Sequence, residues 1–385
     1  MPPPLVLHLL YRFDTGGLEN GVVNLINHLP ADEFRHAVLA LDRVNPDYVS
    51  RIRRPGVEFL SLHKPPGQTW WQYQKIHRLL RQLRPQVLHT RNLAALECQV
   101  PAWAAGVPVR IHGEHGWDVG DTDGSNRRNQ FMRRLYRPFV HRYVALSGQL
   151  QRYLEGPVGV PTSRVQRICN GVDTARYLPA PGGRALLEGS PFNDPDLFVV
   201  GTVGRMQTVK AQPLLAQAFV HALALAPALR TRARLVLVGD GPLRAEVQQV
   251  LQAGGVADLA WLPGDRSDVP ALMQALDLFV LPSVAEGISN TILEAMASGL
   301  PVLASAVGGN AELVLPGETG ELLPAGDVPA MAAAMVRLAQ APALAAAMGR
   351  AGRQRAEAEF SLSGMVRRYG DLYRDELARQ GVLQT

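Results

Sequence analysis

Two glutamates mark the ends of EGISNTILE, residues 286–294, which follows the apolar run LDLFVLPS. Ser289 and Asn290 are both suited to cap a helix at this point. The pattern predicts that Glu294 lies in or near the first turn of that helix and that Glu286 lies in the loop before it. Both carboxylates can then face one cleft.

The ligand that such a helix start favours has two parts. Free amide groups at the start of a helix favour an anion such as a diphosphate. Carboxylates would repel that anion, so they must bind something else, and an ionised carboxylate accepts two hydrogen bonds from the vicinal diol of a sugar. The stretch therefore favours a nucleotide sugar. The alternative is that Glu294 is only a helix-start charge and Glu286 a solvated loop residue.

Two cations, Arg205 and Lys210, stand in GTVGRMQTVKAQP, between an apolar strand pattern and a helical one. Fixed cations at the carboxyl edge of a parallel sheet suit a pyrophosphate. They would also stabilise the negative charge on a departing nucleoside diphosphate. The alternative is a pair of ordinary surface cations.

Glycine turns follow two of the apolar runs. Gly16 and Gly17 in FDTGGLENG allow the backbone to approach a ligand closely, although a turn without a ligand fits equally well. LVGDGPLRAEV holds a second turn, with Arg244 where the dinucleotide motif has its third glycine, so a plain tight turn is favoured. The complete P-loop pattern is absent, which argues against a nucleoside triphosphatase of that class.

HGEHGWD places His112, His115 and Asp118 after another strand pattern. On the residues alone a structural role is favoured for His115. No helical H-E-x-x-H spacing occurs, and Cys98 and Cys169 are too few and too isolated for a zinc site or a disulfide framework. We therefore expect no structural metal.

The segment at 125–144, SNRRNQFMRRLYRPFVHRYV, alternates basic and apolar residues at near-helical spacing. Such a segment can rest on an acidic membrane surface. It can equally be a solvated basic face over a stripe of core residues. Both interpretations remain open.

The elements that position these residues alternate between strands and helices. Seven apolar runs precede a Pro- and Gly-rich stretch at 176–196, and six more follow it. The first seven cover 5–11, 36–42, 57–62, 86–90, 109–115, 143–147 and 164–171. The later six are LFVVGTVGR, RARLVLVGDG, LAWLPGD, LDLFVLPS, PVLASAVGG and GELLP. We predict two doubly wound parallel sheets, with the ligand at the carboxyl ends of their strands.

Length and composition agree with this organisation. The 385 residues suit two domains, and 47% hydrophobic with 19% charged residues is typical of a globular protein. A formal charge of +5 indicates an anionic partner. Composition alone does not decide whether that partner is a phosphate ligand, nucleic acid or an acidic membrane. No run approaches the roughly 18 to 20 apolar residues of a membrane span, and the N-terminal stretch lacks signal-peptide features, so we expect a cytoplasmic protein.

Taken together and in order, GGLEN, EHG, NGVD, GRMQTVK, VGDGPLRAE and EGISNTILEAMASGLPVLAS resemble the motifs of retaining GT-B glycosyltransferases of family 4. The first half further resembles the branch of sugar transferases associated with exopolysaccharide and PEP-CTERM export systems. The resemblance implies an α/β GT-B fold, in which two Rossmann-like doubly wound domains face a central cleft. It implies an acceptor-binding domain over 1–180, a linker over 181–196, a nucleotide-sugar-binding domain over 197–360, and a helix over 361–385 that packs back on the first domain.

The resemblance also implies roles for the charged residues. Arg205 and Lys210 would hold the donor diphosphate. Glu294 would bind the ribose, and Glu286 would contact the transferred sugar. His115 would lie near the donor sugar and the acceptor.

Backbone groups have implied roles as well. Amides near Asn290 and Thr291 would assist at the diphosphate, and Gly16 with Gly17 would close over the phosphates. The remaining implied donor-binding residues are Gly204, Gly241, Gly264 and Arg266, with the base seated around the last two.

The implied activity is transfer of a glycosyl unit from a nucleotide sugar to a hydroxyl of a sugar or lipid-linked sugar acceptor, with retention, in exopolysaccharide or glycolipid assembly. The resemblance implies no metal, no cofactor and no nucleic acid, and a peripheral place on the inner face of the cell membrane is left open. The alternatives are a nucleotide-sugar epimerase or hydrolase of the same fold, and a non-catalytic nucleotide-sugar-binding protein. Two departures from the family are Ala211, where glycine is frequent, and GISNT after Glu286, where many relatives are more apolar.

Overall fold

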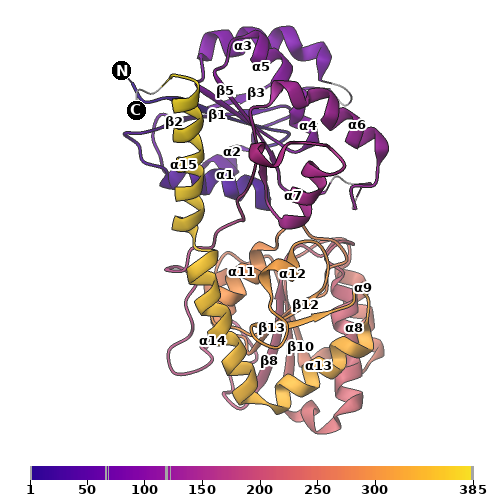
Figure 1. Cartoon of the computed structure of the whole chain (residues 1–385). Helices are drawn as coiled ribbons and strands as arrows, with labels where there is room; N and C mark the ends of the chain where they lie inside the picture. The colour runs from indigo at the N-terminus through magenta and orange to yellow at the C-terminus, as the bar shows by residue number, and fades with distance from the viewer. Residues whose placement is uncertain (1, 66, 68, 118–119, 122, 383–385) are drawn as a thin grey trace. The chain divides into compact units, whose positions relative to one another are not determined.

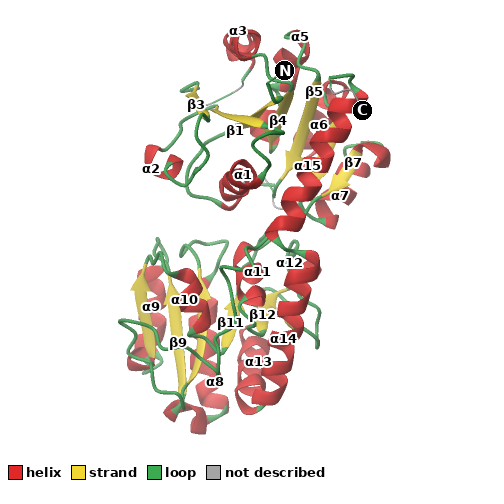
Figure 2. Ribbon diagram, turned by 90° about the vertical axis from the view of Figure 1, so that its left-hand side faces the viewer, coloured by secondary structure: helices red, strands yellow, loops and turns green. Residues whose placement is uncertain are grey.

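The computed structural model describes residues 2–65, 67, 69–117, 120–121 and 123–382. The chain divides into two compact units, one formed by 1–171 with 362–385 and the other by 172–361 (Figure 1). Each unit is built on one parallel β-sheet with helices packed against it (Figure 2).

The first unit has a seven-stranded sheet in the order β3-β2-β1-β4-β5-β6-β7. Its strands are β1 (Leu5–Leu10), β2 (Arg35–Ala40), β3 (Glu58–Ser61), β4 (Val87–Arg91), β5 (Val109–Glu114), β6 (Arg142–Ala145) and β7 (Val165–Arg167). Each strand falls on one of the seven apolar runs, so the predicted strands of the first half are confirmed.

The helices of the first unit cover both faces of this sheet. They are α1 (Gly17–His28), α2 (Pro46–Val49), η1 (Trp70–Gln72), α3 (Tyr73–Leu83), α4 (Leu93–Leu96), α5 (Gln99–Ala104), α6 (Arg127–Tyr136), η2 (Arg137–Phe139), α7 (Gly148–Glu155), η3 (Thr162–Arg164) and α15 (Leu362–Arg379). Successive strand residues face opposite sides, so Leu7 of β1 clusters with Ile76 of α3, whereas Val6 clusters with Tyr369 of α15.

The second unit has a six-stranded sheet in the order β10-β9-β8-β11-β12-β13. Its strands are β8 (Phe198–Val203), β9 (Ala233–Val238), β10 (Ala260–Gly264), β11 (Leu278–Leu281), β12 (Val302–Ser305) and β13 (Gly320–Leu323). All six lie on the later apolar runs. Its helices are α8 (Gln212–Leu225), η4 (Pro227–Thr231), α9 (Arg244–Ala253), η5 (Ala257–Leu259), α10 (Val269–Gln274), α11 (Asn290–Ala297), α12 (Asn310–Leu313), α13 (Val328–Gln340) and α14 (Pro342–Glu359).

The strand order places a potential ligand site in each unit. In the first sheet β1 lies between β2 and β4, and in the second β8 lies between β9 and β11. The order of strands reverses at these points, and ligands of doubly wound sheets bind beyond the carboxyl ends of the strands there. The loops after β8 and β11 carry Arg205, Lys210 and Glu286.

The expected linker at 181–196 is part of the second unit. The Ala185 N–H donates to the Gln274 carbonyl at 2.9 Å, and Arg184 forms an ion pair with Asp277 at 3.2 Å. Leu187 and Phe192 are buried. These two apolar side chains pack on the unit despite the Pro- and Gly-rich composition around them, so the division between the units falls at residues 171 and 172 instead.

In the described part of the chain, no single helix is long and apolar enough to cross a membrane. α13 and α14 satisfy the criteria of length and composition only as a pair, and they meet at an angle of 102°.

We predict that Leu377→Ala destabilises the first unit. Leu377 of α15 is fully buried in the cluster that contains Val6 and Val87. Its truncation leaves a cavity and should lower the free energy of unfolding by about 2–5 kcal/mol. Calorimetric unfolding measures the effect, with Leu186→Ala as the control because Leu186 is exposed. Equal small effects of both changes would show that α15 contributes little to this core.

Candidate active site

Three loops touch through their backbones at the carboxyl ends of β8, β9 and β10. Gly239 has a φ of +121°, and a Cβ there would lie 2.2 Å from the Gly204 carbonyl oxygen. Only glycine permits this close approach. The Gly239 N–H also donates to the Gly264 carbonyl at 2.8 Å, and the Met206 N–H donates to the Asp240 carbonyl, beside Gly241, at 2.8 Å. Gly204, Gly241 and Gly264 are therefore brought together.

The loop after β11 is attached to the same edge. The Val284 N–H donates to the Val209 carbonyl at 2.9 Å, which joins this loop to the one after β8. On its other side, a Cβ added at Gly308 would lie 1.8 Å from the Glu286 carbonyl oxygen, and Gly308 has a φ of +54°. The position of Glu286 is thus set by backbone contacts on two sides.

Lys210 and Glu286 meet across these loops. The Lys210 Nζ lies 2.6 Å from Glu286 Oε1, and the Ser283 hydroxyl donates to the same oxygen at 2.6 Å. The Glu286 side chain is 9% exposed and that of Lys210 is 26% exposed. Both bonds go to Oε1, and no described residue donates to Oε2. Glu286 is therefore held in place with one oxygen still able to accept a hydrogen bond.

Arg205 supplies a second cation at the start of the loop after β8. Its side chain is exposed, and none of the described residues forms an ion pair or hydrogen bond with its guanidinium group. A guanidinium presents a planar set of donors that matches the oxygens of a phosphate. Arg205 and Lys210 together can hold a diphosphate at this edge of the sheet.

α11 begins beside this loop and is capped as predicted. The Ser289 hydroxyl accepts from the Ile292 N–H at 3.3 Å, and Asn290 is the first residue of the helix. Thr291 follows, with its hydroxyl 3.1 Å from that of Ser289. Glu294 is the fifth residue of α11, directly after the first turn, which agrees with the prediction that it lies in or near that turn.

Arg266, expected near a base, is engaged with its own loop. Its guanidinium donates to both oxygens of Asp268, at 2.8 and 2.6 Å, and lies over the ring of Trp261. The hydrogen bond to Asp268 raises the pKa of Arg266. A role of Arg266 in seating the base stays a prediction.

In the first unit, Gly16 caps α1 with extended backbone and Gly17 is the first residue of the helix. The Glu19 carboxylate folds back over Gly16, where a Cβ would lie 2.1 Å from Oε2. Burial raises the pKa of Glu19. Because the obstacle is the end of a flexible side chain, this structure does not itself require glycine at 16.

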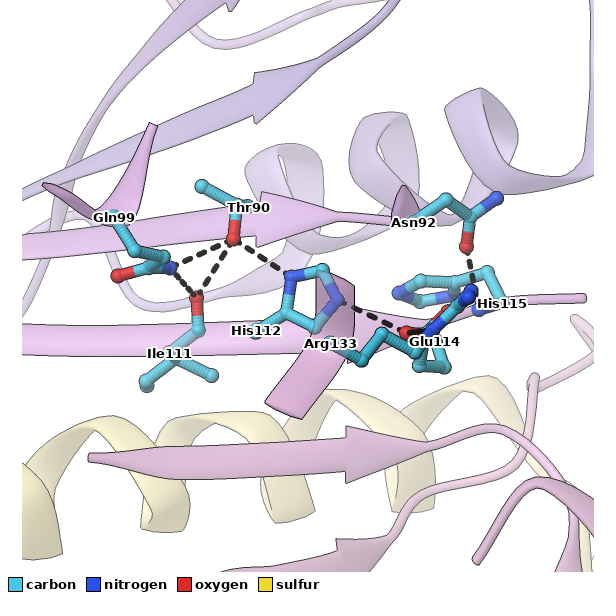
Figure 3. A network of polar contacts seen from close by, with 8 residues as sticks. All are labelled: Thr90, Asn92, Gln99, Ile111, His112, Glu114, His115 and Arg133. Carbon is cyan, nitrogen blue, oxygen red and sulfur yellow. Dashed lines mark hydrogen bonds and ion pairs between the residues drawn. The ribbon is translucent and has the colours of Figure 1, made fainter. Parts of the chain in front are cut away.

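A chain of polar side chains runs along β4 and β5 of the first sheet toward His115 (Figure 3). Gln99 Nε2 donates to the Thr90 hydroxyl at 2.7 Å, and that hydroxyl lies 2.8 Å from His112 Nδ1. His112 Nε2 lies 3.2 Å from Glu114 Oε1. Arg133 of α6 donates to both oxygens of Glu114, at 2.6 and 3.0 Å. The buried ion pair fastens α6 to the end of β5.

Arg91 fixes which ring nitrogen carries the proton in a second buried group, which contains His8 and His36. A guanidinium can only donate, so His8 Nδ1, 3.1 Å from Arg91 Nη2, must be an acceptor and the His8 proton must be on Nε2. His8 Nε2 then donates to His36 Nδ1 at 3.1 Å. Burial, followed by the charge of Arg91, lowers the pKa of His8 well below its ordinary value. Arg91 is thus a buried cation among neutral histidines.

His115 lies between these two groups. The backbone N–H of His115 donates to the Asn92 side-chain oxygen at 2.8 Å. The Nε2 atom of the His115 ring is buried. A Cβ added at Gly113 would lie 2.5 Å from His115 Nε2 and 3.1 Å from His89 Nε2. Burial, and then the charge of Arg91, lowers the pKa of His115 to about 3. His115 is therefore neutral at physiological pH and can donate or accept one hydrogen bond.

The structure brings the predicted residues together in two groups. Arg205, Lys210 and Glu286 share the carboxyl edge of the second sheet with the start of α11 and with three glycines that were predicted to bind the donor. His115 lies at the end of β5 in the first unit. Asp118 lies outside the described residues. Sequence reasoning missed Arg91, and it also missed the pairing of Glu114 with an arginine of the basic segment. Polar residues inside strands predicted to be buried on both faces were the available signal.

The comparisons with known proteins agree with this architecture. Residues 15–176 match the family described as Glycosyltransferase Family 4, and residues 198–341 match Glycosyl transferases group 1. The chain is 32% identical over 317 residues, 78% of each chain, to the putative glycosyltransferase EpsF of Bacillus subtilis (strain 168). It is 27% identical over 267 residues, 68% of each chain, to the UDP-Gal:alpha-D-GlcNAc-diphosphoundecaprenol alpha-1,3-galactosyltransferase of Escherichia coli.

A crystal structure of Anabaena Alr3699/HepE in complex with UDP-glucose has the same fold, with a TM-score of 0.78 and 21% identity over 97% of this chain and 100% of that one. The two parallel sheets and these matches define a glycosyltransferase with the GT-B fold. The chain belongs to glycosyltransferase family 4, as its motifs predicted.

We predict that Ala211→Gly stabilises the second unit. Ala211 precedes α8 in a left-handed conformation, with φ +50° and ψ +39°, which strains any residue with a Cβ. Glycine removes this strain at some cost in chain entropy, so the free energy of unfolding should rise by about 0.5–1 kcal/mol. Ala216→Gly inside α8 is the control and should lower it by about 1 kcal/mol. Denaturant unfolding measures both, and destabilisation by Ala211→Gly would contradict the assignment of strain.

We predict that Glu114→Gln destabilises the first unit by about 3–5 kcal/mol, because Arg133 stays buried without its counter-charge. Burial alone would raise the pKa of Glu114, but Arg133 and His112 hold it below its ordinary value. The ion pair therefore stabilises the fold above the ordinary glutamate pKa of about 4.3, and this contribution is lost as the pH falls toward the native pKa.

Unfolding measured between neutral and acidic pH tests this sign. The wild type should lose more stability on acidification below about pH 4 than Glu114→Gln does, since glutamine does not titrate. Equal losses in the two proteins would show that Glu114 contributes nothing to acid sensitivity.

Proposed function

We propose that this glycosyltransferase moves a sugar from a nucleotide diphosphate sugar to an acceptor hydroxyl, with retention at the anomeric carbon. The observation that carries the proposal is the arrangement of Arg205, Lys210 and Glu286 at the carboxyl edge of the second sheet, beside the start of α11. It pairs two cations suited to a diphosphate with a carboxylate suited to sugar hydroxyls.

Each residue then has a role in the transfer. Arg205 and Lys210 hold the diphosphate and stabilise the charge that develops on it as the glycosidic bond breaks. Amides near Asn290 and Thr291 at the start of α11 assist. Glu286 accepts a hydrogen bond from a hydroxyl of the transferred sugar through Oε2, and the leaving phosphate takes the proton of the acceptor hydroxyl. Because the protein supplies both cations, the proposed mechanism needs no metal ion.

The proposed roles of the remaining residues follow the family resemblance. Glu294, one turn into α11, binds the ribose of the donor. In the first unit His115 is a neutral hydrogen-bonding group, because its pKa of about 3 keeps it uncharged at physiological pH. It is therefore suited to orient a hydroxyl and unsuited to act as a cationic acid.

The names of the relatives support a donor and acceptor class. The E. coli relative is named for UDP-galactose as donor and a diphosphoundecaprenol-linked sugar as acceptor. The Anabaena protein was crystallised with UDP-glucose. We propose a UDP-sugar as the first donor to test and a lipid-linked sugar as the first acceptor, in exopolysaccharide or glycolipid assembly at the inner face of the membrane.

We predict that Glu286→Gln lowers turnover by about a hundredfold while the affinity for the nucleoside diphosphate changes little. The substitution removes the charge that orients the sugar but leaves Arg205 and Lys210 to hold the phosphates. Ser283→Ala is the control, because it removes the other partner of Oε1 and leaves the carboxylate in place. Steady-state kinetics and calorimetric binding measure the two quantities, and equal loss of both would contradict the role of Glu286.

The product distinguishes the proposed reaction from its alternatives. Transfer requires the acceptor, and NMR of the product should show the anomeric configuration of the donor. Product formed from the nucleotide sugar without any acceptor would indicate an epimerase or a hydrolase instead. Donor binding without any turnover would indicate a non-catalytic binding protein.

A further inference from the structure

The first unit exposes five large apolar side chains around α3, α5 and α6. Trp70 is 50% exposed, Trp71 74%, Trp103 57%, Phe131 59% and Leu135 50%. We call these five residues the aromatic face. Single exposed apolar residues are normal, but three tryptophans with two further large side chains in one region indicate a surface that contacts something apolar.

Named contacts join these residues into one region. Tyr73, two residues after Trp71, forms a side-chain hydrogen bond with Tyr136 at the end of α6, one residue beyond Leu135. Trp103 of α5 packs edge-on against Phe139, with ring centroids 5.5 Å apart. α3 also packs against α5, and the two helices lie side by side in both views (Figures 1 and 2).

Cations surround the aromatic face. Lys75, Arg78 and Arg81 are exposed on α3, whose sequence YQKIHRLLRQL contains no acidic residue. Arg127 and Arg128 are exposed at the start of α6. No described residue forms an ion pair or a side-chain hydrogen bond with the guanidinium groups of these four arginines. The surface thus offers positive charge that the protein itself does not neutralise.

The apolar side of α3 is already used within the unit. Ile76 and Leu80, four residues apart, are buried in the cluster that includes Leu7 of the sheet. α3 therefore does not lie on a partner with its apolar stripe. Lys75 donates to the Leu62 carbonyl at 3.2 Å, but the described residues leave the guanidinium groups of Arg78 and Arg81 without a partner. The apolar contribution to any contact comes from Trp70 and Trp71, just before the start of α3.

The basic segment at 125–144 contributes less than its sequence suggests. Arg133 is buried against Glu114, and Arg142 donates to Glu376 at 2.8 Å. Two others donate to backbone carbonyls: Arg134 to that of Pro157 at 2.8 Å, and Arg137 to that of Gly159. These arginines hold the fold together. What the segment adds to the surface is its first two arginines with the exposed Phe131 and Leu135.

We propose that the aromatic face and the cations around it bind the surface of an anionic lipid bilayer. Tryptophan is suited to the interface, where its ring meets the acyl chains and its N–H meets the head groups. Each basic residue near an anionic leaflet adds to the attraction. A region that combines exposed tryptophans with unneutralised arginines is complementary to such a surface in both polarity and charge. The inference does not depend on the proposed sugar donor.

Vesicle sedimentation of the full chain tests the proposal. The protein is mixed with vesicles of phosphatidylcholine alone or of phosphatidylcholine with phosphatidylglycerol, and the bound fraction is measured at low and high salt. The wild type should bind only the anionic vesicles, more weakly at high salt, and its tryptophan emission should shift to shorter wavelength on binding.

Two double variants with matched controls identify the surface. Arg78→Gln/Arg81→Gln should weaken binding to anionic vesicles by about 30-fold, whereas Arg350→Gln, an exposed arginine of the second unit, should not. Trp70→Ser/Trp71→Ser should abolish the emission shift and most of the binding, whereas Leu186→Ser, 75% exposed in the second unit, should not. Thermal unfolding confirms that each variant is folded.

Several outcomes would overturn the proposal. The wild type failing to bind anionic vesicles at low salt is one. Unchanged binding by the tryptophan variant is another, because it would place the contact elsewhere on the molecule. Equal binding of the wild type to neutral and anionic vesicles, or undiminished binding of the arginine variant to anionic vesicles, would also contradict it, since charge would then play no part.

Discussion

The contact between Lys210 and Glu286 connects the features of the second unit that matter for chemistry. It bridges the loop after β8 and the loop after β11, with the Lys210 Nζ 2.6 Å from Glu286 Oε1. The backbones of those loops are held on either side, by the bond from Val284 to Val209 and by the close approach of Gly308 to Glu286. The cation that we propose for the phosphate and the carboxylate that we propose for the sugar hydroxyls are thereby held at one sheet edge, which is what preorganised electrostatic stabilisation requires.

The first unit reaches the same kind of order with buried charge. Glu114 and Arg133 neutralise each other, whereas Arg91 is surrounded by neutral acceptors that its guanidinium keeps in one protonation state. Buried charge is costly unless it is paired or fully hydrogen-bonded. Because breaking these contacts would leave a buried charge unpaired, the network holds the end of β5, and with it His115, in one geometry.

Much of the fold could be predicted from the sequence, because hydrophobic runs and glycine turns are local signals. All thirteen strands among the described residues lie on predicted runs, and Ser289 caps α11. Packing decided the rest. The stretch 181–196 packs on the second unit through Leu187 and Phe192. Arg133 of α6 is buried because the carboxylate of Glu114, at the end of β5, pairs with it. Periodicity does not reveal which charged residue finds such a partner.

Calorimetric binding of UDP, GDP, ADP, TDP and NAD to the metal-free wild type and to Arg205→Ala/Lys210→Ala tests whether these two cations hold the donor diphosphate. The account predicts one preferred nucleoside diphosphate, bound about a hundredfold more weakly by the variant because two charge-assisted contacts are lost. An Arg230→Ala/Arg350→Ala control should bind it as the wild type does. Binding of NAD alone, binding of none of these nucleotides, or equal binding by the wild type and the Arg205→Ala/Lys210→Ala variant would contradict the account.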